Sequence, residues 1–217
     1  AFYDAVSQIK NLNASRKLFL RNIMHELKTP IPKGRLAAEM IEKSKNQERL
    51  VSVFIKLENL INEFAAVEQV TSNIALNNTK ICRIDDVIDE ALDIAMVDPG
   101  QVTISKLEDV SLNADFKLLA IAAKNMIDNA LKYSPNKHVN ITITRESIKF
   151  INEGERLSKE LRHYVEPFTK GESAQKSFGL GLYIVENIIK AHKLTLSYEY
   201  KNGLNVFSFE NLQNIAA

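Results

Sequence analysis

The feature that most constrains the fold is a helical repeat near the start of the chain. Apolar or small residues recur three to four positions apart at Phe19, Ile23, Leu27, Ile31, Gly34, Ala38 and Ile41. At about 100° per residue, this spacing predicts a helix with one stripe packed against a partner. On that helix His25 points away from the stripe, Glu26 lies on the flank beside it, and Thr29 shares the face of His25.

Two prolines follow the exposed His-Glu pair. Pro30 removes a backbone donor and clashes with the preceding turn, which costs about 3 kcal/mol inside a helix, so a bend is expected there. Pro32 perturbs the same region further. A lone histidine is usually a surface residue or a core residue whose hydrogen bonds are satisfied. A helix with a purely structural role, however, would gain nothing from a costly bend next to His25 and Glu26. We therefore treat both residues as functional candidates.

A second helical repeat predicts a hairpin. Its apolar positions are Val53, Leu57, Leu60, Phe64 and Val67. The polar run Ser44-Lys45-Asn46-Gln47 is predicted to form the turn between the two helices. Because one hairpin leaves part of its stripe in water, two copies are expected to pair into a four-helix bundle. A plain coiled-coil dimerisation stalk explains the stripes equally well, but it does not explain the prolines or the outward histidine.

The pattern changes after about Val70, where linker-like polar residues precede shorter elements. Strands are predicted over 80–83, 102–106, 110–112, 139–144, 147–151, 194–200 and 204–209. Helices are predicted over 85–96, 115–133 and 180–192, with Asp115 as the N-cap of the second. These elements predict an α+β sandwich, one sheet with helices on one face. The expected domains are residues 1–72 and residues 76–213.

Composition excludes several classes of protein. A net charge of +1 gives no electrostatic reason to bind nucleic acid or an anionic membrane surface. The single Cys82 cannot form an internal disulfide, which fits a reducing compartment. No apolar run approaches the roughly 20 residues of a membrane span, and the start of the chain lacks a signal-peptide layout. Since the sequence begins in mid-pattern without an initiating Met, we expect a cytoplasmic part of a longer protein.

The helix predicted over 115–133 carries a polar face. Asn125 and Asn129 are four residues apart and therefore stack on one side. Their amide oxygens suit Mg²⁺, which takes few protein ligands and keeps phosphate and water oxygens. Lys132 and Tyr133 follow about one turn later, where a cation and a phenol could meet phosphate. Taken alone, two asparagines on a helix are most simply solvated residues.

A glycine pair opens the last predicted helix, in the run Gly179-Leu180-Gly181-Leu182. Glycines let backbone amides approach a phosphate, and the helix N-terminus adds a favourable dipole. A short glycine pair is weak evidence alone, since such pairs also occur as ordinary helix starts. The polar, non-periodic residues 171–178 before it are predicted to form a mobile lid.

In this order, the motifs resemble those of sensor histidine kinases over nearly the whole chain. The run His25-Glu26-Leu27-Lys28-Thr29-Pro30 resembles the phosphoacceptor box, and the run from Asn125 to Ser134 resembles the N-box. The run Glu166-Pro167-Phe168-Thr169-Lys170 resembles the F-box and lid. The resemblance implies a multi-domain protein: an all-α hairpin that dimerises as a four-helix bundle, then an α+β sandwich of the Bergerat ATP-binding type.

The resemblance also implies an activity and a site. ATP and Mg²⁺ would bind the second domain, and the γ-phosphoryl would pass to His25 and then to an aspartate of a response regulator. The implied ATP site consists of Asn125, Asn129, Lys132, Tyr133, Asn152, Gly154, Phe168, Lys170, Gly179, Leu180, Gly181 and Leu182, with Asn129 as the metal ligand. Glu26 would accept or orient the proton of the other ring nitrogen, and Thr29 resembles the residue that positions water for dephosphorylating the regulator.

The chain departs from the family at the adenine-reading box. The family pattern is Asp-x-Gly-x-Gly, and the matching run here is Asn152-Glu153-Gly154-Glu155-Arg156. The Asn152 carbonyl can still accept from the adenine amino group, but without charge assistance, which weakens binding by about 1 kcal/mol. Arg156 replaces the second glycine, and Ser177 replaces the first glycine of the last glycine box.

Two alternatives stay open at this point. One is a degenerate histidine kinase, phosphatase-only or a scaffold, whose changed adenine box binds ATP weakly. The other is an ATPase of related nucleotide fold without a phosphoacceptor, which the His25 box argues against. The expected partners are a second copy of the chain and a cognate response regulator, and membrane attachment is expected only through a sensor and transmembrane part outside this sequence. The expected location is the cytoplasmic side of an inner-membrane sensor.

Overall fold

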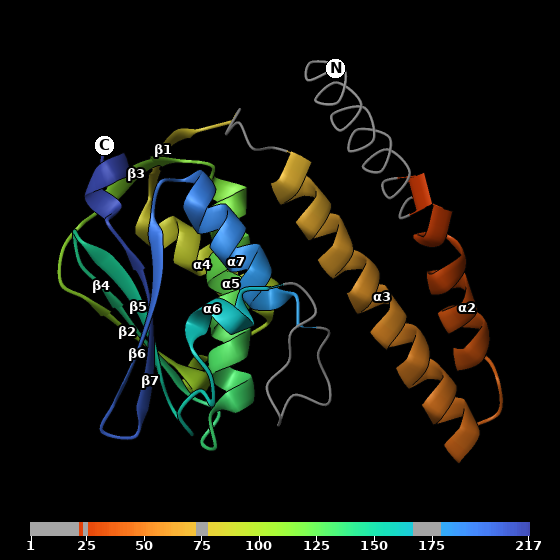
Figure 1. Cartoon of the computed structure of the whole chain (residues 1–217). Coiled ribbons are helices and arrows are strands. Elements are labelled where there is room, and N and C mark those ends of the chain that lie inside the picture. The colour runs from red at the N-terminus through yellow and green to blue at the C-terminus, as the bar shows by residue number, and fades with distance from the viewer. Residues whose placement is uncertain (1–21, 24–25, 73–77, 167–178) are drawn as a thin grey trace, which may run out of the picture. The chain divides into compact units, whose positions relative to one another are not determined.

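The structure, a computed structural model, describes residues 22–23, 26–72, 78–166 and 179–217 (Figure 1). The chain separates into two compact units, residues 1–72 and residues 73–217. The first unit contains helices and the second contains both helices and strands.

In the first unit, helix α2 (Pro30–Glu39) starts at the proline where a bend was predicted. Residues 28–29 form a turn, and Thr29 precedes the helix without a side-chain capping bond. A proline in the first helical position loses nothing, because that backbone N–H has no helical partner in any case. The expected bend within one continuous helix is therefore wrong in detail: Pro30 begins a new helix.

The turn of the hairpin lies earlier than predicted. Helix α3 (Lys45–Ser72) begins inside the polar run that was expected to be the turn, and the connection spans residues 40–44 instead. The Ser44 hydroxyl accepts a hydrogen bond from the Gln47 amide at 3.2 Å, which is the N-cap arrangement. The side chain of Gln47 also donates to the Ala38 carbonyl at 3.1 Å, which ties the start of α3 to α2.

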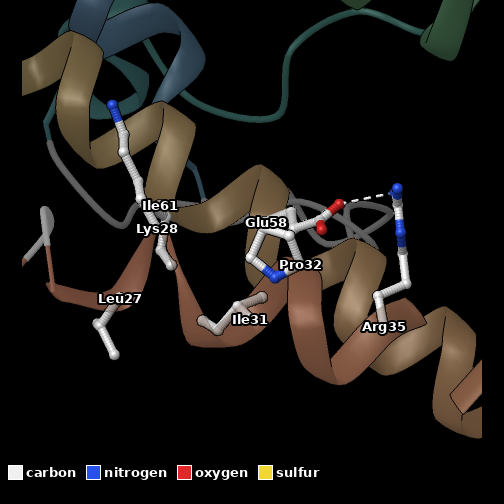
Figure 2. Close-up of a pocket in the computed structure, with 7 residues that line it drawn as sticks. All are labelled: Leu27, Lys28, Ile31, Pro32, Arg35, Glu58 and Ile61. Carbon is white, nitrogen blue, oxygen red and sulfur yellow. Dashed lines mark hydrogen bonds and ion pairs between the residues drawn. The ribbon is translucent and has the colours of Figure 1, made fainter. Parts of the chain in front are cut away.

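Helix α3 packs on α2 through a face that the sequence analysis did not choose. Ile61 is buried, and Arg35 of α2 pairs with Glu58 of α3 at 2.8 Å (Figure 2). By contrast, Val53 and Leu57 of the predicted stripe are 52% and 37% exposed. The predicted stripe thus does not close the hairpin at these two positions. The other predicted stripe positions, Leu60, Phe64 and Val67, lie outside the side chains that the structure describes.

Over residues 78–166 and 179–217, the second unit contains seven strands. They are β1 (Lys80–Arg83), β2 (Val102–Lys106), β3 (Ser111–Ala114), β4 (Val139–Ile143), β5 (Ser147–Glu153), β6 (Thr195–Lys201) and β7 (Leu204–Glu210). Its helices are α4 (Ile84–Ala95), α5 (Phe116–Tyr133), α6 (Leu161–Tyr164) and α7 (Gly181–Ala191), with single 3₁₀ turns η1 (Pro99–Gln101) and η2 (Leu212–Ile215). Every predicted strand and helix is present within a few residues, whereas α6, η1 and η2 were not predicted.

The strands form two sheets and not the single sheet expected. Five strands pair in the order β2-β4-β5-β7-β6, with β2 parallel to β4 and the other neighbours antiparallel. Strands β1 and β3 pair separately as an antiparallel ribbon. Both are four residues long, and β1 leads directly into α4, whereas β3 leads through Asp115 into α5.

Helices α4, α5 and α7 cover one face of the five-stranded sheet, as predicted for the sandwich (Figure 1). Helix α5 contacts both α4 and α7 and also packs on β5. Its buried face is rich in alanine, which allows close helix packing. Beneath it, the rings of Phe150 and Phe209 lie 5.1 Å apart in the core. No helix in the described residues is both long enough and apolar enough to cross a bilayer.

Candidate nucleotide site

The polar face of α5 meets the first residue of α7. Asp115 caps α5 by accepting from the Leu118 amide at 3.2 Å. Along the helix, the side-chain amide of Asn125 donates to the Ile121 carbonyl at 2.8 Å. This bond occupies the side-chain nitrogen of Asn125, so the side-chain oxygen of Asn125 faces Gly181. A Cβ atom placed on Gly181 would lie 3.3 Å from Asn125 Oδ1.

Asn129 lies against the same glycine. Its side-chain nitrogen and oxygen are 3.8 and 4.0 Å from the position a Gly181 Cβ would take. A side chain on Gly181 would therefore fill the space between the two asparagines and the start of α7. Because the missing side chain keeps two amide groups beside the positive end of a helix, this contact is suited to an anionic ligand.

A second corner of the site forms where β5 ends. Asn152 is buried, and its side-chain nitrogen donates to the Glu153 carbonyl at 2.8 Å. Gly154 follows with φ of 156°, a conformation that favours glycine. A Cβ atom there would lie 3.0 Å from the Tyr133 carbonyl, so Gly154 lets the end of β5 approach the end of α5. The two predicted motifs, far apart in sequence, therefore meet.

Residues that the sequence analysis missed support this corner. The Tyr198 hydroxyl donates to Asn205 Oδ1 at 2.8 Å and accepts from the Leu157 amide at 3.0 Å. Burial raises the pKa of Tyr198, so the phenol stays protonated and keeps donating. Asn205 is buried opposite Asn152 in the β5–β7 pairing. An asparagine between the apolar residues Leu204 and Val206 was the signal that could have identified it.

Lys132 and Tyr133 lie together at the exposed end of α5. The Lys132 Nζ is 4.9 Å from the centroid of the Tyr133 ring, within the range of a cation–π contact. The Tyr133 ring is 41% exposed. Both side chains are therefore available to a ligand at the corner formed by Gly154.

The remaining predicted residues divide into three groups. His25, Phe168 and Lys170 lie outside the residues that the structure describes, as does the whole predicted lid, residues 171–178. Glu26 and Thr29 are exposed in the first unit. In the second unit, Gly179 has a left-handed φ of 73°, and Leu182 is half-buried.

Leu180 was predicted to line the ATP site, but its side chain does not face a ligand. Its side chain is 1% exposed, so it packs in the core at the start of α7. A nucleotide could meet this residue only through its backbone. The side chain instead anchors the glycine-containing turn, which explains an apolar residue between two glycines.

The side chains at this site can hold a magnesium ion only together with a bound nucleotide. Among the described residues, no group of three or more His, Cys, Asp or Glu side chains could enclose a metal by itself. Mg²⁺ bound with a nucleotide needs only one or two protein ligands, because phosphate and water oxygens complete its shell. The amide oxygens of Asn125 and Asn129 beside Gly181 fit that requirement.

Comparisons with known proteins agree with this architecture. Residues 114–212 match the family described as Histidine kinase-, DNA gyrase B-, and HSP90-like ATPase. The chain is 35% identical to Sensor histidine kinase ArsS of Helicobacter pylori over 215 residues, which cover 97% of this chain and 50% of that protein. It is 29% identical to Heme sensor protein HssS of Staphylococcus epidermidis over 216 residues, 89% of this chain and 47% of that protein.

A solved structure shares the fold. Acinetobacter baumannii histidine kinase AdeS matches with a TM-score of 0.60 and 20% identity, over 87% of this chain and 98% of that one. The chain spans about half the length of the curated relatives it matches. Nearly the whole chain is therefore similar to a sensor histidine kinase, and residues 114–212 match the ATPase family that histidine kinases share.

Proposed function

We propose that this chain is the catalytic core of a two-component sensor kinase. ATP bound by residues 76–213 would phosphorylate His25 within residues 1–72, and the phosphoryl group would then pass to an aspartate of a response regulator. The observation that carries the proposal is the meeting of Gly181 with Asn125 and Asn129 in a domain of the ATPase family. The His25 box precedes this domain in the same chain.

At the nucleotide site, each residue has a distinct proposed task. The backbone amides at the start of α7 would bind phosphate, because Gly181 leaves room for a close approach. Lys132 would neutralise phosphate charge from the end of α5. Asn152 would accept from the adenine amino group through its oxygen, since its nitrogen already donates to the Glu153 carbonyl. Phe168 and Lys170 are proposed to complete the site on the strength of the sequence motif alone.

A magnesium ion would be held by the side-chain oxygen of Asn129, with Asn125 beside it. Bound there, the ion would neutralise charge on the phosphate groups. The two amides are stacked one helical turn apart, and Asn125 is held in place by its bond to the Ile121 carbonyl. This bond fixes which atom of Asn125 faces the ligand.

At the phosphoacceptor, a neutral imidazole nitrogen of His25 would attack the γ-phosphorus as the bond to the ADP oxygen breaks. Glu26, exposed beside it, would hold the proton on the other ring nitrogen and stabilise the positive imidazole that forms. Thr29, exposed just before α2, would position water for the reverse task of dephosphorylating the regulator.

A second copy of the chain is the proposed partner of the first unit. Apolar side chains remain exposed on both helices of the hairpin and on the connection between them: Leu36, Met40, Ile41, Leu50, Val53, Ile55 and Leu57. An isolated hairpin leaves this apolar surface in water, which is unfavourable, whereas a four-helix bundle would bury it. The regulator would dock on the same bundle beside His25. The sensor and any membrane-spanning part would belong to sequence outside this chain.

A degenerate, phosphatase-only or scaffold role is the second candidate. The specific observation in its favour is Asn152, which offers adenine an uncharged amide where the family pattern has a carboxylate. It predicts weak ATP binding with an intact fold. The two candidates therefore differ in one measurable quantity, the transfer of label from ATP.

The test is incubation of the full chain with γ-labelled ATP and Mg²⁺, followed by acid and base treatment. The kinase proposal expects label that acid removes and base does not, as for phosphohistidine, and none in a His25→Gln variant. His138→Gln, which changes a half-buried histidine of the other unit, is the matched control and should label normally. Label retained by His25→Gln contradicts the assignment of His25, and an unlabelled wild-type chain favours the second candidate.

A further inference from the structure

His192 is a buried histidine that the proposed chemistry does not use. It follows the last residue of α7 and is fully buried. Its Nε2 accepts a hydrogen bond from the backbone amide of Asp115 at 3.0 Å, and its Nδ1 donates to the Ile188 carbonyl at 2.8 Å. An amide can only donate and a carbonyl can only accept, so both bonds together require the neutral ring with its hydrogen on Nδ1.

The bond to Asp115 joins the end of α7 to the start of α5, and the bond to Ile188 holds the ring against its own helix. Asp115 is also the residue whose side chain caps α5. Its backbone amide is bound by His192 and its carboxylate accepts from the Leu118 amide, so both interactions fix the first turn of α5. At the opposite end of α7, Gly181 lies against Asn125 of the same helix. The two helices are therefore packed antiparallel and are in contact at both ends of α7.

The lengths of the two connected segments match. Eleven residues separate Gly181 from His192, a rise of about 16 Å at 1.5 Å per residue. Ten residues separate Asp115 from Asn125, a rise of about 15 Å. A shift of α7 along α5 at the His192 end must therefore appear at the Gly181 end, where the space beside Asn125 leaves little room for it.

We propose that His192 is a positioning residue for the nucleotide site: it fixes α7 along α5 and so sets the approach of Gly181 to Asn125 and Asn129. Nucleotide affinity should then depend on the charge state of a histidine that never touches the nucleotide. The inference rests on the proposed nucleotide site.

The charges around the ring decide the direction of the pH effect. Burial lowers the pKa of His192, while the bond to Ile188 and the charge of Asp115 oppose the shift without cancelling it. On its own helix, Lys190 pairs with Glu186 at 2.7 Å, and the next residue, Lys193, is exposed. From β1, Cys82 shares Asp115 as a neighbour, and burial with the charges of Asp86 and Asp115 raises the pKa of its thiol, which stays neutral.

The neutral ring therefore holds the two helices together at neutral pH. When the pH falls below the lowered pKa, Nε2 gains a hydrogen that faces the Asp115 amide hydrogen, and this bond is lost. Because the folded protein resists protonation more than the unfolded chain does, stability also falls as the pH drops below the ordinary histidine value of 6.5. The structure thus predicts weaker nucleotide binding in acid.

Two variants whose side chains do not titrate distinguish the bond to Asp115 from the bond to Ile188. The side-chain oxygen of His192→Gln can reach the place of Nε2 and accept from Asp115, whereas His192→Asn reaches only the place of Nδ1 and can serve Ile188 alone. Affinity for ATP with Mg²⁺ is measured by calorimetry on the full chain at about pH 8 and at about pH 4.5, well below the ordinary histidine value because burial lowers the pKa of His192. The phosphate groups of ATP titrate equally in every sample, so differences between proteins report on His192.

At the higher pH, the wild-type chain and His192→Gln should bind ATP with the same affinity. On acidification, the affinity of the wild-type chain should fall about five- to tenfold more than that of His192→Gln. His192→Asn should bind about tenfold more weakly at both pH values. His138→Gln, a change at a half-buried histidine bonded to Thr103, is the control and should keep the wild-type pH profile.

Identical pH profiles for wild type and His192→Gln would overturn the proposal, as would wild-type affinity in a folded His192→Asn. If His192→Asn fails to fold, the comparison of wild type with His192→Gln still decides. A wild-type chain that binds no ATP at either pH contradicts the proposed nucleotide site, and with it the role given to His192.

Discussion

Phe54 of α3 packs directly onto Gly34 of α2. A Cβ atom on Gly34 would come within 2.6 Å of the Phe54 Cζ, well inside the contact distance of two carbon atoms. Glycine inside a helix costs about 1 kcal/mol relative to alanine. Its presence in α2 is therefore explained by the approach of the aromatic ring.

The first prediction is that Gly34→Ala destabilises the hairpin. Overpacking against Phe54 costs about 1–3 kcal/mol, and the better helix propensity of alanine returns about 1 kcal/mol, so a net loss of up to about 2 kcal/mol is expected. Thermal unfolding measures it. In a Phe54→Leu background the same substitution should instead be neutral or stabilising, and equal effects in both backgrounds would refute the contact. Gly100→Ala, with open space around it, is the control.

The second prediction concerns the exposed apolar face of α3. Val53→Glu places a charge where a partner helix is proposed to pack, so self-association at micromolar concentration should weaken by at least about tenfold. Sedimentation of the full chain measures this. Ile81→Glu makes the same change at an exposed apolar residue of the other unit and should leave association unchanged. A wild-type chain that is monomeric at micromolar concentration contradicts the proposed dimer.

The third prediction follows from four alternating charges in the second unit. Lys106 pairs with both Asp85, at 2.6 Å, and Asp109, and Arg83 also contacts both carboxylates, at 2.8 and 3.4 Å. Hydrogen bonds from Lys106, and for Asp85 also from Arg83, lower the pKa of both aspartates below the usual 3.8. The stabilisation is thus complete above 3.8 and is lost as the pH falls through the lowered folded values.

Lys106→Gln should therefore lower the unfolding temperature near neutral pH, and its difference from wild type should shrink as the carboxylates protonate in acid. Because the groups are largely exposed, the shift should be small and should weaken with added salt. Unfolding temperatures from about pH 2 to about pH 7 test it. Lys149→Gln removes an equal charge from an exposed site on β5 and should show no such convergence.

The second unit was predictable where its signals are local. Asp115 precedes an apolar helical pattern and caps α5 through the Leu118 amide, three residues away. The last hairpin turns at Asn202 and Gly203, which both have the positive φ that a tight two-residue turn requires. Such signals act within a few residues, so sequence alone can reveal them.

The hairpin was less predictable because α3 is apolar on two sides. The repeat containing Val53 and Leu57 and the face containing Phe54 and Ile61 are both compatible with packing on α2. What favours the second face is a contact with Gly34 twenty residues away, which periodicity cannot reveal. Ser44 posed a similar problem, since a polar residue can begin either a turn or a helix.

The candidate site depends both on local sequence signals and on contacts between residues that are distant in sequence. Asn125, Asn129 and Gly181 were recognised from their motifs, whereas the support of Asn152 by Asn205 and Tyr198 depends on the pairing of β5 with β7 and β6 with β7. Strand register between distant segments is set by the whole sheet, so no local pattern predicts which polar residues will face each other.

The last prediction tests whether Asn152 reads the base. Restoring the family carboxylate, Asn152→Asp, should strengthen ATP binding by about 1–2 kcal/mol, or roughly five- to thirtyfold, because a neutral hydrogen bond to the adenine amino group becomes charge-assisted. GTP affinity should hardly change, since guanine presents a carbonyl at that position. The structure adds a cost: an aspartate cannot donate to the Glu153 carbonyl, so the variant should also unfold at a lower temperature.

Asn129→Asp is the contrasting variant, because it acts where the metal is proposed to bind. It should change the Mg²⁺ dependence of binding and leave the preference for ATP over GTP intact. Calorimetric titration of both variants with each nucleotide measures the four affinities. Equal strengthening of ATP and GTP by Asn152→Asp would mean that the carboxylate acts at a distance on the whole nucleotide. No strengthening of either would place the adenine elsewhere, and Asn152 would then serve only to close the corner between β5 and α5.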